Sequence, residues 1–268
     1  MKFALNHVTT ARKGFLDFLD VAVAAGFEGV EERNDLGDAF FSGLDTAQAA
    51  REVQQRGLEL HALAQLNRFD DWNNQKATDA HALIEVAAAS GAQGICLIPC
   101  NDGTRSNRLR NKECLQLALR ELKPLLESRG IIGLLEPLGF VTSTLRFKAH
   151  AVDAIDAVAG EHCFRLIHDT FHHHVSQDKE YFAELTAMVH VSGVNDRQLN
   201  PEQMTDADRV LIDAADQLGN IDQLDHLLND HYVGPVSLEV FAPSVQALDD
   251  PTMPLRRSRE FVGAALSV

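Results

Sequence analysis

Short apolar runs alternate with longer segments of helical periodicity along the whole chain. Eight of these runs have the length of a β-strand, and turn or polar residues separate them from their neighbours. They occupy residues 2–5, 29–32, 58–66, 94–99, 131–136, 164–169, 188–192 and 235–241. Within 109–128, the apolar side chains fall at 115, 118, 119, 122, 125 and 126, which form one face of an α-helix. The pattern predicts eight strand–helix units in series.

Capping residues mark several of the predicted helix ends. Asp45 is followed three residues later by Gln48, a combination that favours a helix start. Glycines stand shortly before four of the predicted strands, where they are expected to end the preceding helices. These glycines are Gly26, Gly91, Gly130 and Gly160.

Eight strand–helix units within about 250 residues are typical of an α/β protein of the (β/α)8 barrel type. A doubly wound parallel sheet is the alternative, but it would carry a glycine-rich loop after its first strand. The corresponding residues 7–12 contain no glycine. No linker or low-complexity stretch interrupts the chain, so we expect residues 1–268 to form a single TIM-barrel domain.

Charge and cysteine usage restrict the expected partners and environment. The 268 residues include 24 Lys and Arg against 39 Asp and Glu, a formal net charge of −15. Such an acidic surface repels nucleic acid and anionic lipid, so we expect no nucleic acid and no membrane as a partner. The four cysteines form no Cys-x-x-Cys pair, which favours reduced thiols. Without a signal-peptide pattern or an apolar run of about 20 residues, the expected location is cytoplasmic.

Residues that bind metals or exchange protons stand at the ends of four predicted strands. Glu136, Asp169, His190 and Glu239 each lie near the C-terminal end of their strand. Barrel enzymes keep their active sites at this end. Because the four strands are consecutive, we expect the four side chains to converge there.

Three carboxylates in one apolar mouth repel one another, and a divalent cation would relieve that repulsion. One imidazole with three carboxylates suits Mn²⁺, Co²⁺, Zn²⁺ or Mg²⁺. We therefore predict one divalent metal ion as cofactor, held by Glu136, Asp169, His190 and Glu239, and no organic cofactor.

Three histidines, His172 to His174, follow the predicted strand that ends at Asp169. His172 is close enough to the strand end to lean over the barrel mouth and contact a substrate or a metal. His173 and His174 are expected to continue into the next helix and turn away from the mouth. His168 precedes Asp169 and should face the helices as a core histidine.

Other candidate substrate-binding residues lie in loops near the predicted mouth. Asn6 ends the first strand, and the triplet Glu32, Arg33 and Asn34 lies at the end of the second. Each of them binds substrate hydroxyls or belongs to a solvated loop. Trp72, the only tryptophan, follows the third strand and forms either a pocket wall or ordinary packing. The polar segment 195–216 lies in an unusually long connection, and long loops in compact barrels tend to serve the site.

Five stretches carry a resemblance to a known family. Residues 2–7 (KFALNH), 135–140 (LEPLGF), 168–174 (HDTFHHH), 190–193 (HVSG) and 238–242 (LEVFA) look like the bacterial inosose (2-keto-myo-inositol) isomerases. These belong to the xylose-isomerase-like TIM-barrel superfamily of sugar isomerases and epimerases. The likeness extends over nearly the whole chain.

The resemblance implies roles for several residues. Glu136, Asp169, His190 and Glu239 would bind one metal, and Glu136 and Glu239 would exchange a substrate proton. His172 would match the family histidine that touches a substrate hydroxyl. Arg197, in the loop after His190, would match a substrate-binding arginine.

The expected activity is metal-dependent isomerisation or epimerisation of a keto-polyol, most simply an inosose. A metal that chelates the ketone oxygen and its neighbouring hydroxyl stabilises an enediolate, while a glutamate moves the proton. The expected partner is the small keto-polyol itself, and the chain could assemble as a homodimer or homotetramer.

Three alternatives remain beside this expectation. The substrate could be another ketose or a hydroxypyruvate-like compound. A non-catalytic sugar-binding barrel would not need both Glu136 and Glu239. A DNA-repair endonuclease of the same superfamily would need further histidines from early strands and a basic groove, whereas 97–100 contains no histidine and the chain is acidic.

Overall fold

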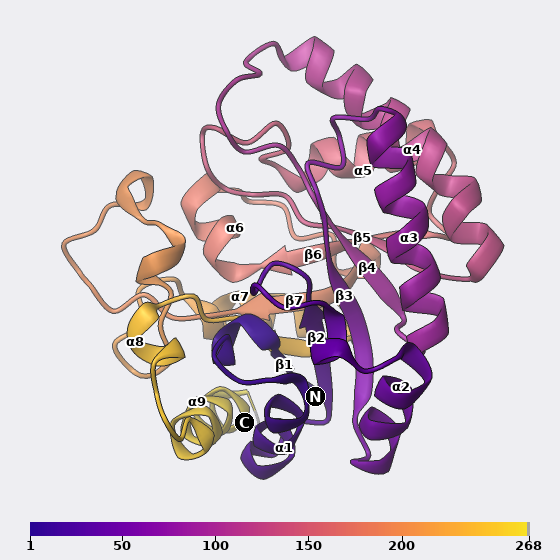
Figure 1. Ribbon diagram of the computed structural model, residues 1–268. Helices are drawn as coiled ribbons and strands as arrows, with labels where there is room; N and C mark the ends of the chain where they lie inside the picture. Colours follow the sequence, from indigo (N-terminus) through magenta and orange to yellow (C-terminus); the bar gives the residue numbers. More distant parts are fainter. Residues whose placement is uncertain (267–268) are drawn as a thin grey trace.

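Eight parallel strands close into a barrel in chain order, from β1 through β8 and back to β1 (Figure 1). The computed structural model describes residues 1–266. The strands are β1 (Phe3–Asn6), β2 (Gly29–Arg33), β3 (Glu59–Asn67), β4 (Gly94–Ile98), β5 (Ile132–Leu135), β6 (Phe164–Asp169), β7 (Thr186–Val191) and β8 (Val236–Leu238). The predicted (β/α)8 TIM barrel is thereby confirmed, since each predicted run overlaps one strand.

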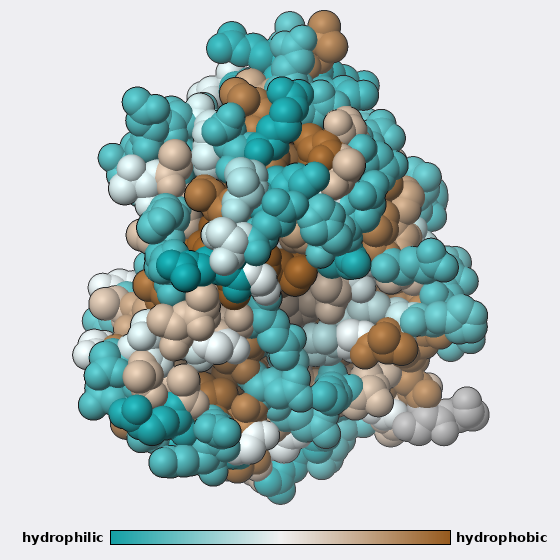
Figure 2. Space-filling model, turned by 90° about the vertical axis from the view of Figure 1, so that its right-hand side faces the viewer, coloured by the Kyte–Doolittle hydropathy of each residue, from teal (hydrophilic) through white to brown (hydrophobic). Residues whose placement is uncertain are grey.

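Helices surround the barrel and connect its strands (Figure 1). They are α1 (Phe15–Ala25), α2 (Thr46–Gln55), α3 (Asn74–Ser90), α4 (Arg108–Arg129), α5 (Lys148–Ala157), α6 (Thr170–Ser176), α7 (Asn220–Asn229), α8 (Pro243–Gln246) and α9 (Thr252–Ala265). Short 3-10 turns lie at η1 (His7–Thr10), η2 (Phe40–Gly43), η3 (Ala183–Leu185), η4 (Pro201–Gln203) and η5 (Asp206–Asp208). The face that α3 and α4 present to solvent is mostly hydrophilic, with scattered apolar residues (Figure 2).

Most of the predicted helix ends are confirmed. Asp45 forms a capping box with Gln48 at the start of α2. Three of the glycines take the left-handed conformation at the C-caps of α1, α3 and α4, namely Gly26, Gly91 and Gly130. The expectation for Gly160 was wrong, because α5 already ends at Ala157 with Val158 as its C-cap. Gly160 instead lies where a Cβ would come within 2.7 Å of the Phe164 ring.

Two apolar layers hold the barrel together. The larger one lies between the strands and the helices, and the smaller one fills the barrel interior. The interior layer consists of Ala62, Ala64, Cys96, Leu134, Ile167 and Met188. This apolar interior closes the barrel below its polar mouth, because alternate residues of each strand point inward. Within residues 1–266, no helix has the length and apolar character needed to cross a membrane.

Candidate metal centre

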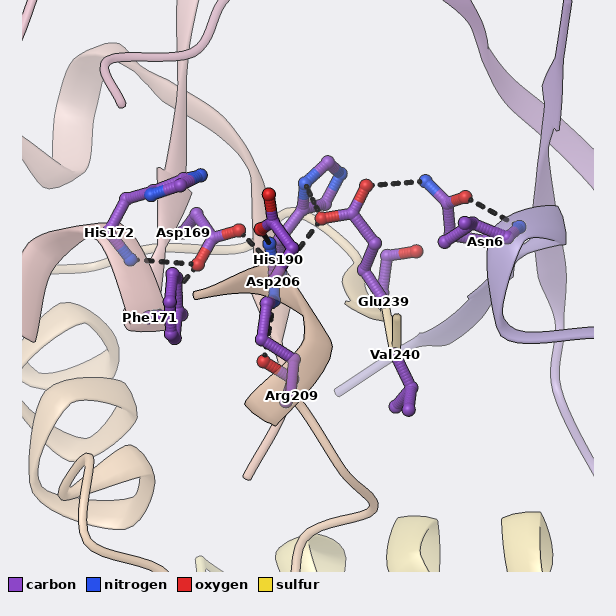
Figure 3. A network of polar contacts seen from close by, with 12 residues as sticks. Asn6, Asp169, Phe171, His172, His190, Asp206, Arg209, Glu239 and Val240 are labelled. Carbon is purple, nitrogen blue, oxygen red and sulfur yellow. Dashed lines mark hydrogen bonds and ion pairs between the residues drawn. The ribbon is translucent and has the colours of Figure 1, made fainter. Parts of the chain in front are cut away.

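Four side chains converge at the C-terminal mouth of the barrel. Asp169 ends β6, His190 lies in β7, and Glu136 and Glu239 directly follow β5 and β8. Each residue offers one ligand atom, and these atoms all lie within 4.8 Å of one another. All four side chains are buried, and Figure 3 shows Asp169, His190 and Glu239 turned toward a common centre.

The parallel ladder explains this convergence. Asp169 and His190 are direct partners across β6 and β7. The N–H of Glu239 donates to the carbonyl of Val191 at 2.9 Å, so the ladder between β7 and β8 continues past the end of β8. Side chains in register on the inner face therefore reach the same level of the barrel.

His190 contacts several carboxylates of this cluster. Its Nδ1 lies 3.4 Å from Glu136 Oε1 and 3.2 Å from Glu239 Oε2. Burial opposes protonation of the ring, yet Glu239, Glu31 and Glu136 together raise the pKa of His190 well above its usual range. Burial raises the pKa of Glu136 as well.

Glu31 lies on the other edge of the His190 ring. Its Oε2 is 3.1 Å from His190 Nε2, and its Oε1 accepts a short hydrogen bond from Ser237 Oγ. Glu31 is fully buried. Because Nε2 faces Glu31, Nδ1 is the nitrogen that faces the other carboxylates.

Arg209, from the connection between β7 and β8, reaches the cluster. Its Nη2 donates to Asp169 Oδ2 at 2.7 Å and to Glu239 Oε2 at 2.9 Å (Figure 3). The guanidinium lies over the rings of Phe171 and Phe241, with its central carbon 5.0 and 4.7 Å from their centroids. Although burial alone would raise it, His190 and Arg209 hold the pKa of Glu239 well below its usual range.

The structure places Arg197, the predicted substrate-binding arginine, elsewhere. It is exposed in the loop after β7, whereas Arg209 of the same connection folds back over the mouth. An antiparallel bridge between Gly193 and Val210 pulls this part of the loop toward the barrel. The signal that could have identified Arg209 is the apolar run 210–212 that follows it inside an otherwise polar loop.

Asn6 and Arg33 complete the polar surroundings of Glu239. Asn6 Nδ2 donates to Glu239 Oε1 at 3.2 Å, and Arg33 Nη1 donates to the same oxygen at 2.9 Å. Asn6 was a predicted substrate-binding residue, and it reaches the site by contacting a proposed metal ligand. Arg33 belongs to the predicted polar triplet after the second strand, and it lines the cavity at the mouth. The sequence pattern did not identify Glu31 as a site residue.

Glu32 points away from the mouth, against the prediction that it contacts substrate. Its Oε2 lies 2.7 Å from His7 Nδ1, and its Oε1 accepts from the N–H of Phe41. Strand alternation is the physical reason, because residues 31 and 33 of β2 face the interior and residue 32 must face outward.

The predicted pocket residue Trp72 is also elsewhere. Its half-buried side chain packs against the apolar layer outside the barrel, so the packing alternative holds. Trp72 does not line the cavity at the barrel mouth.

A cavity of about 230 Å³ opens onto the cluster at Glu136, His190 and Glu239. His172 is buried and lines this cavity. Its Nδ1 has no hydrogen-bond partner among the described residues, while its N–H donates to Asp169 Oδ1 at 3.2 Å. Further lining comes from Arg33, Gln65, Asn101, Phe140, Arg209 and Phe241.

The other histidines of the motif lie outside the cavity. His173 Nδ1 contacts Lys148 Nζ at 2.7 Å on the outer side of the barrel. His174 is half-buried in α6. His168 is fully buried and bonded to Gln223 at 2.9 Å, as expected for a core histidine.

The residues present fit a divalent metal ion. Three carboxylates and one imidazole nitrogen are close enough to share one cation, and oxygen and nitrogen donors of this kind suit several divalent metals. Glu31 supplies the outer carboxylate that often orients a metal-binding histidine. The two arginines that contact Glu239 offset part of the negative charge.

Comparison with solved structures places the chain among similar barrels. A xylose isomerase domain-containing protein from Salmonella typhimurium LT2 has 25% identity and a TM-score of 0.89, over 99% of this chain and 97% of that chain. The IolI protein, solved with a bound zinc atom, has 19% identity and a TM-score of 0.86, over 100% and 98%. D-Psicose 3-epimerase from Clostridium cellulolyticum H10, solved with D-tagatose, has 13% identity and a TM-score of 0.77, over 100% of both chains.

No curated protein sequence matches this chain significantly. The family model described as xylose isomerase-like TIM barrel matches residues 19–264, which is most of the chain. The chain therefore belongs to the xylose isomerase-like TIM barrel family.

Proposed function

We propose that the chain is a divalent-metal-dependent isomerase or epimerase of a keto-polyol, with an inosose as its substrate. The observation that carries this proposal is the buried cluster of Glu136, Asp169, His190 and Glu239 at the floor of a polar cavity. The resemblance of the strand-end motifs to inosose isomerases favours the cyclic polyol. The sugar epimerases of related fold support the reaction class.

The metal would be held by the four clustered side chains, and when bound it supplies stabilisation of negative charge on a substrate oxygen. Glu136 and Glu239 would exchange the proton on the carbon next to the ketone. Both glutamates border the cavity, so either can reach a substrate held there. Return of the proton to the same carbon from the other face gives an epimer, and return to the neighbouring carbon gives the isomer.

The remaining lining residues would bind and orient the polyol. His172 has a free ring nitrogen to bond a hydroxyl group. Gln65 and Asn101 bring amide groups to the wall, and amides both donate and accept. The rings of Phe140 and Phe241 cover part of the cavity and exclude water.

Deuterium incorporation tests the proposal. The metal-loaded protein is incubated in D₂O with a panel of inososes and ketohexoses, and the products are followed by NMR. We expect deuterium at the carbon next to the ketone, together with conversion of one inosose. Failure of every compound to exchange, in protein shown to contain the metal, would favour a non-catalytic sugar-binding barrel.

Two further expectations belong to this proposal. We propose a homodimer or homotetramer, which sedimentation velocity would distinguish from a monomer. We also propose a location in the cytoplasm, where the small keto-polyol substrate would be the partner.

A further inference from the structure

A second hollow, of about 540 Å³, lies outside the barrel between the start of α4 and the start of α5. The loops that follow β4 and β5 border it and are bonded to each other. Gly103 N–H donates to the Thr142 carbonyl at 3.3 Å, and Thr142 Oγ1 donates to Asn101 Oδ1 at 2.6 Å. The buried side chains of Leu115 and Leu145 contribute to its lining. None of the four proposed metal ligands borders this hollow.

The charge of the hollow is opposite to that of the protein. Four cationic side chains line it, with Asp153 as the single acidic one. The cations are Arg105, Arg108, Lys112 and Arg146. In a chain with a net charge of −15, this local excess of positive charge distinguishes the hollow from the average surface. We call it the basic hollow.

Three of these cations have no carboxylate partner within residues 1–266. Arg105 is the exception, since its Nη2 lies 2.9 Å from Asp70 Oδ2. Arg146 donates to the carbonyls of Gly139 and Val175. Arg108 and Lys112 are exposed and free of ion pairs. No ion pair with a carboxylate therefore offsets the repulsion among these three cations.

The backbone adds to the positive potential. Arg108 is the first residue of α4, and Phe147 is the N-cap of α5, so two helices begin at the basic hollow. The N-terminal end of a helix carries partial positive charge, which favours an anion. At these two ends the Lys148 N–H already donates to Asp178 Oδ2 and the Arg110 N–H to Asn107 Oδ1, so the side-chain cations carry most of the attraction.

Apolar side chains stand beside these cations. Leu109 and Val141 both line the basic hollow, although 68% and 74% of their surfaces are exposed. The ring of Phe147 also lines it. Exposed apolar groups next to cations suit a ligand with an anionic head and an apolar or aromatic body.

We propose that the basic hollow is a second ligand site, which binds a small phosphate monoester with an apolar or aromatic group. Arg108, Lys112 and Arg146 bind the dianion, because guanidinium groups match the geometry of phosphate oxygens and lysine adds a point charge. Leu109 and Phe147 cover the apolar part. This site is separate from the metal centre and does not depend on the proposed isomerase activity.

Calorimetric titration with phenyl phosphate tests the site, using the metal-loaded protein at low ionic strength. The variant Arg108→Gln/Lys112→Gln removes two cations whose side chains form no hydrogen bond or ion pair within the described part of the chain. The matched control is Arg110→Gln/Arg120→Gln, because both arginines are exposed on α4 but do not line the basic hollow. Both variants lose the same charge and keep the metal centre.

We expect saturable binding that weakens by about tenfold or more in the Arg108/Lys112 variant and by less than about twofold in the control. Binding should also weaken as salt is added. Benzoate should bind more weakly than phenyl phosphate, and phenol should not bind. Absence of saturable binding, equal loss in both variants, or equal binding of phenol would overturn the proposal. Unchanged affinity in the Arg108/Lys112 variant would also overturn it, since the anion would then bind elsewhere.

Discussion

His190 Nε2 lies 3.1 Å from Glu31 Oε2, while the opposite nitrogen of the same ring faces Glu136 and Glu239. Glu31 is itself held by Ser237, its neighbour in the barrel interior. This arrangement leaves only one orientation in which the imidazole can present a lone pair to the cluster. A carboxylate on the outer nitrogen also makes the ring a better metal ligand.

Glu31→Gln should therefore weaken binding of the divalent metal by about 10- to 100-fold, the usual cost of losing such an outer carboxylate. Competition with a chromophoric chelator measures the affinity. Glu32→Gln is the matched control, because the neighbouring carboxylate points outward to His7. Unchanged metal affinity in the Glu31 variant would show that this contact does not support a metal site.

Glu136→Gln and Glu239→Gln should each lower deuterium exchange into the substrate by about 10³-fold or more, because each removes a base and an anionic ligand. Circular dichroism should show an intact fold. Glu121→Gln, on the exposed side of α4, serves as the control with the same change of charge. Near-normal exchange in either site variant would remove that glutamate from the mechanism.

His172→Ala should lower kcat/KM by about 10²-fold and leave the metal content largely unchanged. His172 lines the cavity and its Nδ1 has no hydrogen-bond partner within residues 1–266, and a hydrogen bond to a substrate hydroxyl that strengthens in the transition state contributes about 2–3 kcal/mol. His174→Ala is the comparison and should have little effect. If His172→Ala kept its kcat/KM and His174→Ala lost it, the assignment would be contradicted.

Arg209→Gln should destabilise the metal-free protein by about 3–5 kcal/mol, because it leaves the buried carboxylate of Asp169 without its arginine and removes one of the two arginines that contact Glu239. Added Mn²⁺ should then raise the melting temperature more in this variant than in the wild type. Arg197→Gln should behave as the wild type, since that side chain is exposed. Equal behaviour of the two variants would argue against a charge-balancing role for Arg209.

His173 should make the protein less stable in mild acid. Burial and the neighbouring Lys148 lower the pKa of His173 to about 3. The unfolded state takes up a proton near pH 6.5 and the folded state does not, so stability is present above that pH and decreases as the pH falls. Between pH 7.5 and 5.5 this residue should cost about 1.4 kcal/mol of unfolding free energy.

Chemical denaturation at the two pH values measures this cost. His173→Asn keeps an acceptor for Lys148 and cannot be protonated, so its unfolding free energy should decrease less than that of the wild type. Titrating groups that do not contact His173 are common to both proteins and cancel in the comparison. An identical decrease in both proteins would contradict the prediction.

The chain order of strand ends was enough to predict the barrel and the four clustered side chains. Parallel strands of a closed barrel all end at one rim, so residues at those ends must meet whatever the details of packing. The outward position of His173 and the core position of His168 followed from the same strand and helix periodicities. The prediction for Glu32 was wrong because it did not take into account that side chains alternate along a strand. If residues 31 and 33 face the barrel interior, residue 32 must face outward.

The tertiary structure alone decided which residues of the long loops join the site. The connection between β7 and β8 contains Arg197 and Arg209, and its composition does not say which one returns to the mouth. Arg209 is held at the mouth by the bridge between Gly193 and Val210 and by its packing over the rings of Phe171 and Phe241. A flexible loop can close in many ways at similar entropic cost, so only its packing against the finished barrel selects one.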